Sequence, residues 1–308
     1  MATASNNRDK HITFDADFKE DFTEGMLRML SEGSSNDVRI ILNDGEITAN
    51  KDVLAAQCQY FAANFGWKKI TKDDSDHLEI TDCSKEVMER IIKYLFTGTI
   101  KFKDLSLLKL LELLNQVRKM LLKGDLQDLI ESYIKDDVIS LETLEKVGGD
   151  QDQEHNLCTD IVRGLAYVDR FVIESVKVYI LGGILLLLPA IAKDDEAISA
   201  FSTLPCQVVK ELLSMLISTL KKDTTVSPPS SYRSAQLRCL LAWYNQNKDL
   251  CQEDKEEILG TIDLDSLPAA DLFELVKPSG LFPDDEVDRR IIECLRERDK
   301  LKKNLAAN

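Results

Sequence analysis

The sequence predicts an α+β fold at the N-terminus, in which helices cover a small sheet, followed by an all-α region. Segments that alternate apolar and polar residues, as strands do, are confined to residues 38–102. Beyond them the apolar residues recur with helical spacing, and a polar, glycine-containing stretch at 146–156 indicates a boundary. The length of 308 residues is typical of two domains.

The first predicted helix covers residues 14–31. Its apolar side chains recur every four residues and form one stripe: Phe14, Phe18, Phe22, Met26 and Leu30. Because this stripe precedes the first strand, it must pack against a later element of the same chain or against another chain. We retain both alternatives, a helix that crosses to a second subunit and one that packs on the leucine-rich helix at 107–122.

A small sheet and its helices follow. Strands are predicted at 38–42 and 46–50, and Asn43-Asp44-Gly45 between them favours a tight hairpin turn. A third strand is predicted at 77–82 and a fourth at 99–102. The intervening helix begins after Ser84 and ends at Gly98, and two further helices cover 107–122 and 126–133.

The segment DVLAAQCQYFAANF at 52–65 predicts a helix that is apolar on nearly all sides. After Asp52 only Gln57, Gln59 and Asn64 interrupt the apolar residues. A surface helix of a soluble domain would show one polar face, so this helix should be buried on both faces. A domain with so few strands offers little cover, which favours a second copy of the chain over the C-terminal helices as the covering surface.

The rest of the chain is predicted to be helical up to about residue 300. Helices are expected at 157–166, 172–188, 231–247, 253–259, 269–277 and 284–298, and one or two helices at 204–220. The apolar run at 179–192 is 14 residues long, which is too short to span a bilayer, so it predicts a buried core helix. The charged end at 301–308 is expected to fray.

Composition restricts the partners and the compartment. With 39 basic and 54 acidic side chains the net charge is -15, so the surface repels phosphate backbones and anionic lipids. We therefore expect no nucleic-acid partner and no membrane partner. Seven scattered cysteines and an N-terminus without an apolar signal-peptide core indicate reduced thiols in the cytoplasm, the nucleus or both.

The sequence contains no motif for catalysis or for a cofactor. Only three histidines are present, and the Asp, Glu, His and Cys residues of DQDQEHNLC at 150–158 have no second cluster at zinc-ligand spacing. No phosphate-binding glycine loop or nucleophile elbow occurs. Cys58 lies among apolar neighbours, where a thiol packs as a small hydrophobic group. We expect no enzyme, no metal site and no cofactor.

Residues 35–135 resemble a BTB (POZ) domain. The resemblance rests on Asp37-Val38 in the first strand, on Leu54-Ala55-Ala56 with Tyr60-Phe61, and on Phe96-Thr97-Gly98. The second half, through FSTLPCQVVKELL, SYRSAQLRCLLAWYNQN and IDLDSLPAADLFELV, resembles the helical BACK domain. The resemblance implies four parts: an N-terminal dimer-forming helix at 1–33, a BTB/POZ domain at 34–137, a BACK-like domain at 138–300 and a tail at 301–308.

The resemblance also implies a non-enzymatic homodimer that binds cullin-3 and an unknown protein substrate, as an adaptor of a RING ubiquitin ligase. Its implied dimer interface comprises Phe14, Phe18, Phe22, Met26, Leu30, Val53, Leu54, Ala56 and Tyr60. Its implied cullin-facing residues are Phe65, Trp67, Ile70, Lys72, Leu107 and Leu110.

One residue departs from the pattern of cullin-binding relatives. They carry a glutamate two positions after an apolar residue in this loop, where the present chain has Ile70-Thr71-Lys72. A reversed charge at an interface opposes binding. The alternative is a dimeric BTB scaffold that does not bind cullin, and that pairs with other BTB proteins, antagonises them or serves as a corepressor platform.

Overall fold

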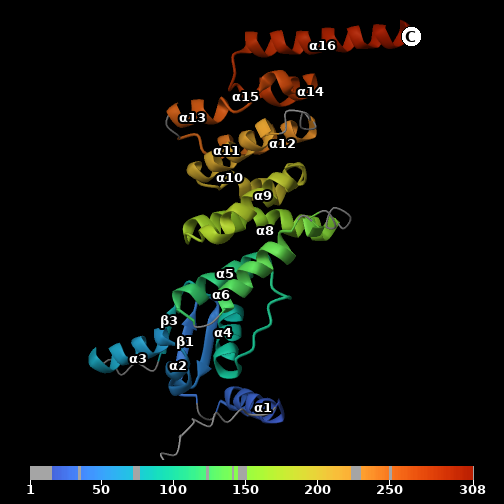
Figure 1. The fold of residues 1–308 in the computed structure, drawn as a ribbon. Helices are drawn as coiled ribbons and strands as arrows, with labels where there is room; N and C mark the ends of the chain where they lie inside the picture. Colours follow the sequence, from blue (N-terminus) through green and yellow to red (C-terminus); the bar gives the residue numbers. More distant parts are fainter. Residues whose placement is uncertain are drawn as a thin grey trace, which may run out of the picture. The chain divides into compact units, whose positions relative to one another are not determined.

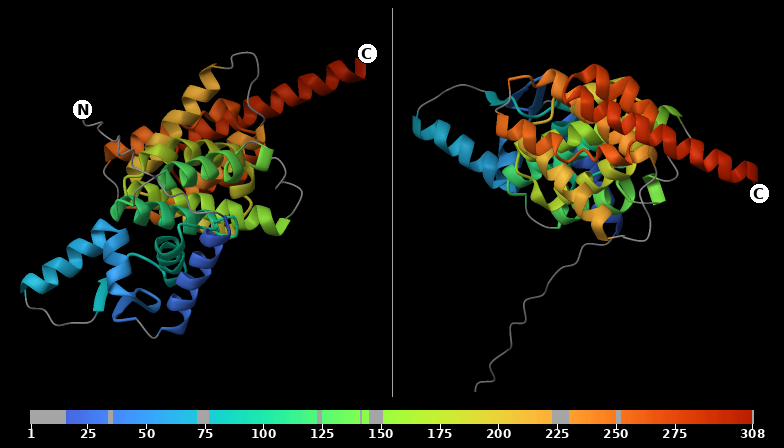
Figure 2. Two further views of the ribbon diagram at one scale, coloured as in Figure 1. Left: turned by 60° about the horizontal axis from the view of Figure 1, so that its bottom comes forward. Right: turned by 90° about the horizontal axis from the view of Figure 1, so that it is seen from above.

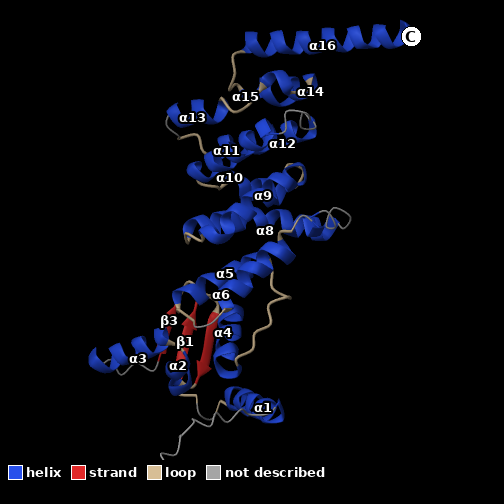
Figure 3. Cartoon of the chain, in the orientation of Figure 1, coloured by secondary structure: helices blue, strands red, loops and turns tan. Residues whose placement is uncertain are grey.

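The computed structural model describes residues 16–33, 36–71, 77–122, 125–140, 142–144, 151–222, 230–249 and 252–307. They form two compact units, the first within residues 1–104 and 112–127, the second within residues 105–111 and 128–308. Figure 3 shows strands in the first unit and helices in the second. The α+β region followed by a helical region is therefore confirmed. Residues 105–111 and 128–137, expected in the first domain, group with the second unit.

The first unit is built on a three-stranded sheet with strand order β2-β1-β3. The strands are β1 (Val38–Leu42), β2 (Gly45–Ala49) and β3 (His77–Ile80). The predicted hairpin pairs β1 with β2 antiparallel, whereas β3 lies parallel on the other side of β1. Ile40 is buried and its neighbour Arg39 is not, which is the period-two pattern of a strand with one covered face.

Six helices accompany the sheet or follow it directly. They are α1 (Ala16–Glu32), α2 (Lys51–Gln57), α3 (Gln59–Thr71), α4 (Lys85–Thr97), α5 (Leu107–Lys119) and α6 (Leu126–Tyr133). Helix α4 begins after Ser84 and ends at Gly98, as predicted, although Ser84 makes no side-chain capping hydrogen bond. The helix ends because Gly98 takes the left-handed conformation at φ +69° and its N–H bonds to the carbonyl oxygen of Tyr94.

The apolar segment at 52–65 is two helices and not one. Cys58 has an extended backbone, with φ -139° and ψ 123°, and separates α2 from α3. Asn50 caps α2, since its side chain accepts a hydrogen bond from the backbone N–H of Val53 at 3.0 Å. A periodicity of apolar residues does not reveal this break, because both halves keep helical spacing.

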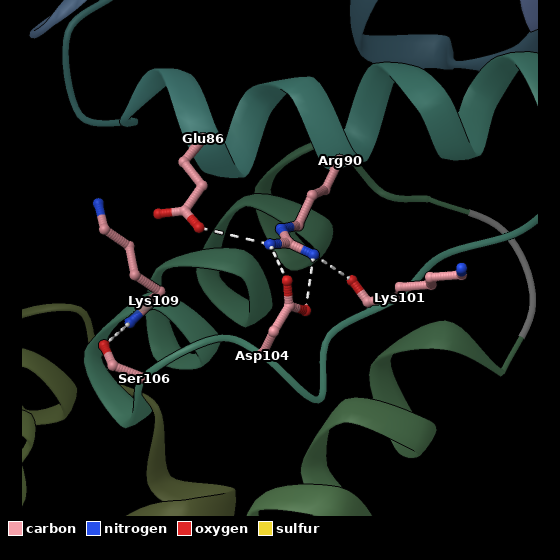
Figure 4. Close-up of polar contacts among 6 residues, drawn as sticks. All are labelled: Glu86, Arg90, Lys101, Asp104, Ser106 and Lys109. Atoms are coloured by element: carbon pink, nitrogen blue, oxygen red, sulfur yellow. Dashed lines mark hydrogen bonds and ion pairs between the residues drawn. The ribbon is translucent and has the colours of Figure 1, made fainter.

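The fourth predicted strand does not form, and residues 99–102 are a loop. Figure 4 shows that a side chain of α4 holds this segment. Arg90 donates hydrogen bonds to the backbone oxygen of Lys101 at 2.7 Å and to the Asp104 carboxylate at 3.0 and 2.9 Å. The Asp104 carboxylate in turn raises the pKa of Arg90, so the fork remains charged.

The second unit consists of packed helices, which Figure 1 shows in successive layers. The longer ones are α8 (Gln151–Arg170), α9 (Glu174–Ile191), α10 (Asp195–Ser202), α11 (Cys206–Lys222), α12 (Ser230–Gln246), α13 (Gln252–Leu259) and α16 (Asp284–Ala307). A π-helical turn at Ile134–Val138 continues from α6, and short helical turns occupy Leu264–Ser266 and Ala269–Ser279.

Two predictions about the second unit need correction. Helix α8 begins at Gln151, before the start predicted at residue 157, so most of the acidic stretch at 150–158 is helical. The C-terminal residues 301–307 continue α16 as a regular helix where fraying was expected. Both views of Figure 2 show the far end of α16 extending away from the other helices of its unit.

Helix α9 is a buried core helix, as predicted. Its length and hydropathy would by themselves allow it to cross a membrane. Helices α10 and α11 are long and apolar enough to do so only if the bent pair is counted as one span. However, 56% of α9 is buried, and it lies against α8, α11 and α12. The helix continues through Gly182, Gly183 and Pro189, so the interruptions seen in the sequence do not break it.

Candidate interaction surface

The N-terminal stripe is only partly available for a partner. Helix α1 contacts α4 of its own chain, which is a different helix from the leucine-rich one at 107–122 that was considered for packing in cis. Phe22 is 55% exposed, whereas Met26 and Leu30 are half-buried. Phe14 and the side chain of Phe18 lie outside the described residues. The helix is therefore confirmed, and its role in a dimer stays a prediction.

Helices α2 and α3 bury one face and leave the other open. Leu54 and Phe61 are fully buried in the core of the first unit. On the remaining surface Ala56 is exposed, and Val53 and Tyr60 are half-buried, so the described part of the chain covers one face only. The expected dimer contact of Leu54 is wrong, because a side chain with 0% exposure has no surface to offer a second subunit.

A cavity of about 370 Å³ is lined by residues of both partly exposed helices, α1 and α2. Phe22 of α1 and Ala56 of α2 both line it, together with Tyr94 from the end of α4 and Leu122 from beyond α5. Residues that are distant in the sequence thus share one partly apolar surface. Tyr94 and Leu122 were missed by the sequence reasoning, because periodicity shows which residues of a helix are alike but not which ends of helices meet.

A polar corner lies beside this surface. Lys119 donates to both carboxylate oxygens of Asp82 at 2.9 Å. Burial raises the pKa of Asp82, but the hydrogen bond from Lys119 outweighs it, so the carboxyl has a lowered pKa. Burial also raises the pKa of Tyr60, whose hydroxyl therefore stays protonated at neutral pH. A hydroxyl beside an ion pair can give an otherwise apolar contact its orientation.

The expected cullin-facing residues do not form one exposed surface. Phe65, Leu107 and Leu110 are buried, so their assignment to a partner contact is wrong. Phe65 stacks on Phe61 with ring centroids 6.0 Å apart, and Leu107 lies close to Gly164 of α8. The side chains of Trp67 and Ile70, and Lys72 altogether, lie outside the described residues.

The thiol of Cys58 and the possible metal ligands indicate what chemistry this surface can support. The buried thiol of Cys58 donates to the backbone oxygen of Met120 at 3.6 Å, which is the packing role expected of it. Among the residues that the structure describes, no three His, Cys, Asp or Glu side chains are grouped so as to hold a metal ion. An apolar helix face that its own chain leaves open is instead the mark of a protein-interaction domain.

Comparison with known proteins identifies this domain. Residues 26–137 match the family model of the BTB/POZ domain. The chain therefore contains a BTB/POZ domain, and such domains are protein-interaction modules that mediate dimerisation and partner binding without catalysis. The predicted fold and the first of the two resemblances are confirmed.

Curated relatives align with this part of the chain. Mouse Rho-related BTB domain-containing protein 2 is 32% identical over 96 residues, which is 31% of this chain and 13% of the relative. Human zinc finger and BTB domain-containing protein 38 is 33% identical over 97 residues, or 30% and 8% of the two chains. The chain thus spans a small fraction of these relatives' length. The solved BTB domain of human gigaxonin is 19% identical, with a TM-score of 0.33, and the match covers 41% of this chain and 98% of that one.

Proposed function

We propose that the protein is a homodimeric, non-enzymatic adaptor that recruits a protein substrate to a cullin-3 RING ubiquitin ligase. The BTB/POZ domain pairs two chains and binds the cullin, and the second unit serves as a BACK-like helical domain. It acts in the cytoplasm, the nucleus or both. The open apolar face of α2, continuous with the cavity beside α1, is the observation that supports the pairing.

Pairing is supported by the apolar side chains that a single chain leaves uncovered in the first unit. Val53, Ala56 and Tyr60 are apolar or amphipathic side chains that one chain leaves exposed or half-buried. Burying such a face gains about 25 cal/mol for each Å² of apolar surface removed from water. A second copy presents the same face and can match it about a two-fold axis, which is the commonest symmetry of homodimers.

Cullin binding is supported by the family resemblance and limited by two observations. Three of the six residues first assigned to the contact are buried, so a cullin contact would use the solvent-facing side of α5 and the segment 72–76, which lies outside the described residues. Lys72 in that segment has the charge opposite to that of the glutamate expected there. This lysine favours the second candidate function, a BTB scaffold that pairs with or antagonises other BTB proteins, or supports a corepressor, without binding cullin.

One experiment distinguishes the two functions. Purified full-length protein is titrated with the cullin-3 N-terminal domain by calorimetry, while light scattering measures its mass. An adaptor binds cullin as a dimer of twice 34.8 kDa, and Lys72→Glu strengthens the binding. The control is Lys103→Glu, which makes the same change of charge at an exposed lysine of the first unit. Intact dimers of both wild type and Lys72→Glu that do not bind cullin would leave the scaffold as the function.

A further inference from the structure

The second unit has an open groove that the proposed adaptor function does not use. It has a volume of about 630 Å³, within the range of ligand-binding clefts, and lies among the end of α13, the turn that follows and the start of α16. Its apolar lining includes Leu259, Ile262 and Phe282, each of which is half-buried.

Part of this apolar lining packs against a buried hydrophobic cluster. Ile262 and Phe282 pack against the small cluster formed by Leu264, Leu272 and Val287 with their buried neighbours. Leu264 also lines the groove and is 9% exposed. A surface supported from beneath by a packed core keeps its shape, so an incoming side chain meets a preformed site.

Acidic side chains also line the groove. Four carboxylates line it, Glu256, Asp263, Asp265 and Glu286, together with the guanidinium of Arg290, and Arg233 lies 3.5 Å from Asp263. The Arg290 guanidinium is already engaged, at 2.6 Å from Asp265 and 3.0 Å from Glu293. With these two guanidinium groups counted, the four carboxylates still leave a net negative charge beside the apolar side chains, which attracts cations and repels phosphate groups.

We propose that this groove binds a basic amphipathic helix of a partner protein. Apolar side chains spaced three and four residues apart on that helix enter between Leu259 and Phe282, and its lysines or arginines face Glu256 and Glu286. Charge complementarity selects this occupant over an acidic or uncharged helix. The groove lies within the second unit, so the inference does not depend on cullin binding or on pairing through the BTB/POZ domain.

The test uses the full-length protein and two labelled peptides of about 18 residues, or five helical turns. Both carry leucines along one helical face, and lysines flank them in one peptide and glutamates in the other. Fluorescence anisotropy should show saturable binding of the lysine peptide, at least about tenfold tighter than that of the glutamate peptide, and weakening as salt is added. Equal affinity for the two peptides would overturn the proposal.

Variants locate the binding. The pair Glu256→Gln and Glu286→Gln should weaken binding of the lysine peptide about tenfold. The pair Glu253→Gln and Glu274→Gln removes the same charge from exposed positions that do not line the groove, and it should bind as the wild type does. An equal loss of affinity in both pairs of variants would show that binding depends only on the net charge of the protein and would contradict the proposal. Masses above the dimer that disappear only in the groove variants would instead assign the groove to a second copy of the chain.

Discussion

Lys177 shows how a single charged residue is accommodated inside the second unit. It is 6% exposed, and its ammonium lies 3.0 Å from Asp169 of α8 and 2.7 Å from Glu211 of α11. Burial alone would lower the pKa of this lysine, but the hydrogen bonds that it donates to Glu211 and Asp169 outweigh burial and raise it. The lysine therefore stays charged and joins three helices.

Replacing this lysine should destabilise the second unit. In Lys177→Met the side-chain volume is kept, but Asp169 and Glu211 lose their shared cation and repel each other. Because both carboxylates remain about one-third exposed, we expect a loss of about 1–3 kcal/mol in the free energy of unfolding, less than for fully buried pairs. Chemical denaturation followed by circular dichroism measures it. Adding Asp169→Asn and Glu211→Gln should restore part of the loss, and no recovery would contradict the electrostatic explanation.

At the scale of elements, two adjacent glycines in α9 have different roles. A Cβ atom at Gly183 would lie 2.4 Å from Cδ1 of Ile161 and 2.9 Å from Cγ2 of Ile139, so this glycine lets neighbouring elements approach α9 closely. A Cβ atom at Gly182 would find its nearest neighbour, Cε of Met215, at 4.0 Å. The sequence shows the two glycines side by side, and only the packing distinguishes them.

This difference predicts opposite effects of the same substitution. Gly183→Ala should lower the free energy of unfolding by about 1–3 kcal/mol, because the added methyl group forces Ile161 and Ile139 to move. Gly182→Ala should raise it by up to about 1 kcal/mol, because alanine favours the helix and the space is open. Thermal and chemical denaturation of the two variants side by side check this. Similar effects in both would show that the close approach at Gly183 is not important.

At the scale of the whole molecule, the two proposals assign separate tasks to the two units. The BTB/POZ unit presents an open apolar face at α2, and the helical unit presents an acidic groove at the start of α16. Pairing through the first unit would double the second, so that two weak peptide contacts would act together with higher avidity. The net charge of -15 keeps such an assembly soluble and favours basic partners.

Pairing can be tested by replacing one exposed alanine in each unit with arginine. Ala56→Arg places a bulky charge on the open face of α2, and it should shift the mass measured by light scattering from the dimer toward 34.8 kDa. The dissociation constant should rise at least about a hundredfold, since burying an unpaired charge costs several kcal/mol. Ala270→Arg makes the same change at an exposed alanine of the second unit and should leave the dimer intact. A dimer that survives Ala56→Arg would place the interface elsewhere.

Helices and strands were largely predictable, because their signals are local. The hairpin at 38–49, the limits of α4 and the buried α9 all follow from spacing, turn residues and caps within a few positions. The strand expected at 99–102 does not form, and Arg90 of another element contacts that segment, which the sequence pattern does not reveal. The prediction of a single helix at 52–65 was wrong, because Cys58 adopts an extended backbone between two helices.

The amino-acid sequence by itself determined the fold class, the BTB/POZ domain and the helical nature of the second half, because periodicity and local turn chemistry are written in consecutive residues. The tertiary structure decided which apolar side chains remain on the surface. It buried Phe65, Leu107 and Leu110, left Ala56 exposed, and brought Glu256 and Glu286 to one groove. Burial is set by neighbours that are remote along the chain, and a repeating pattern alone does not specify those neighbours.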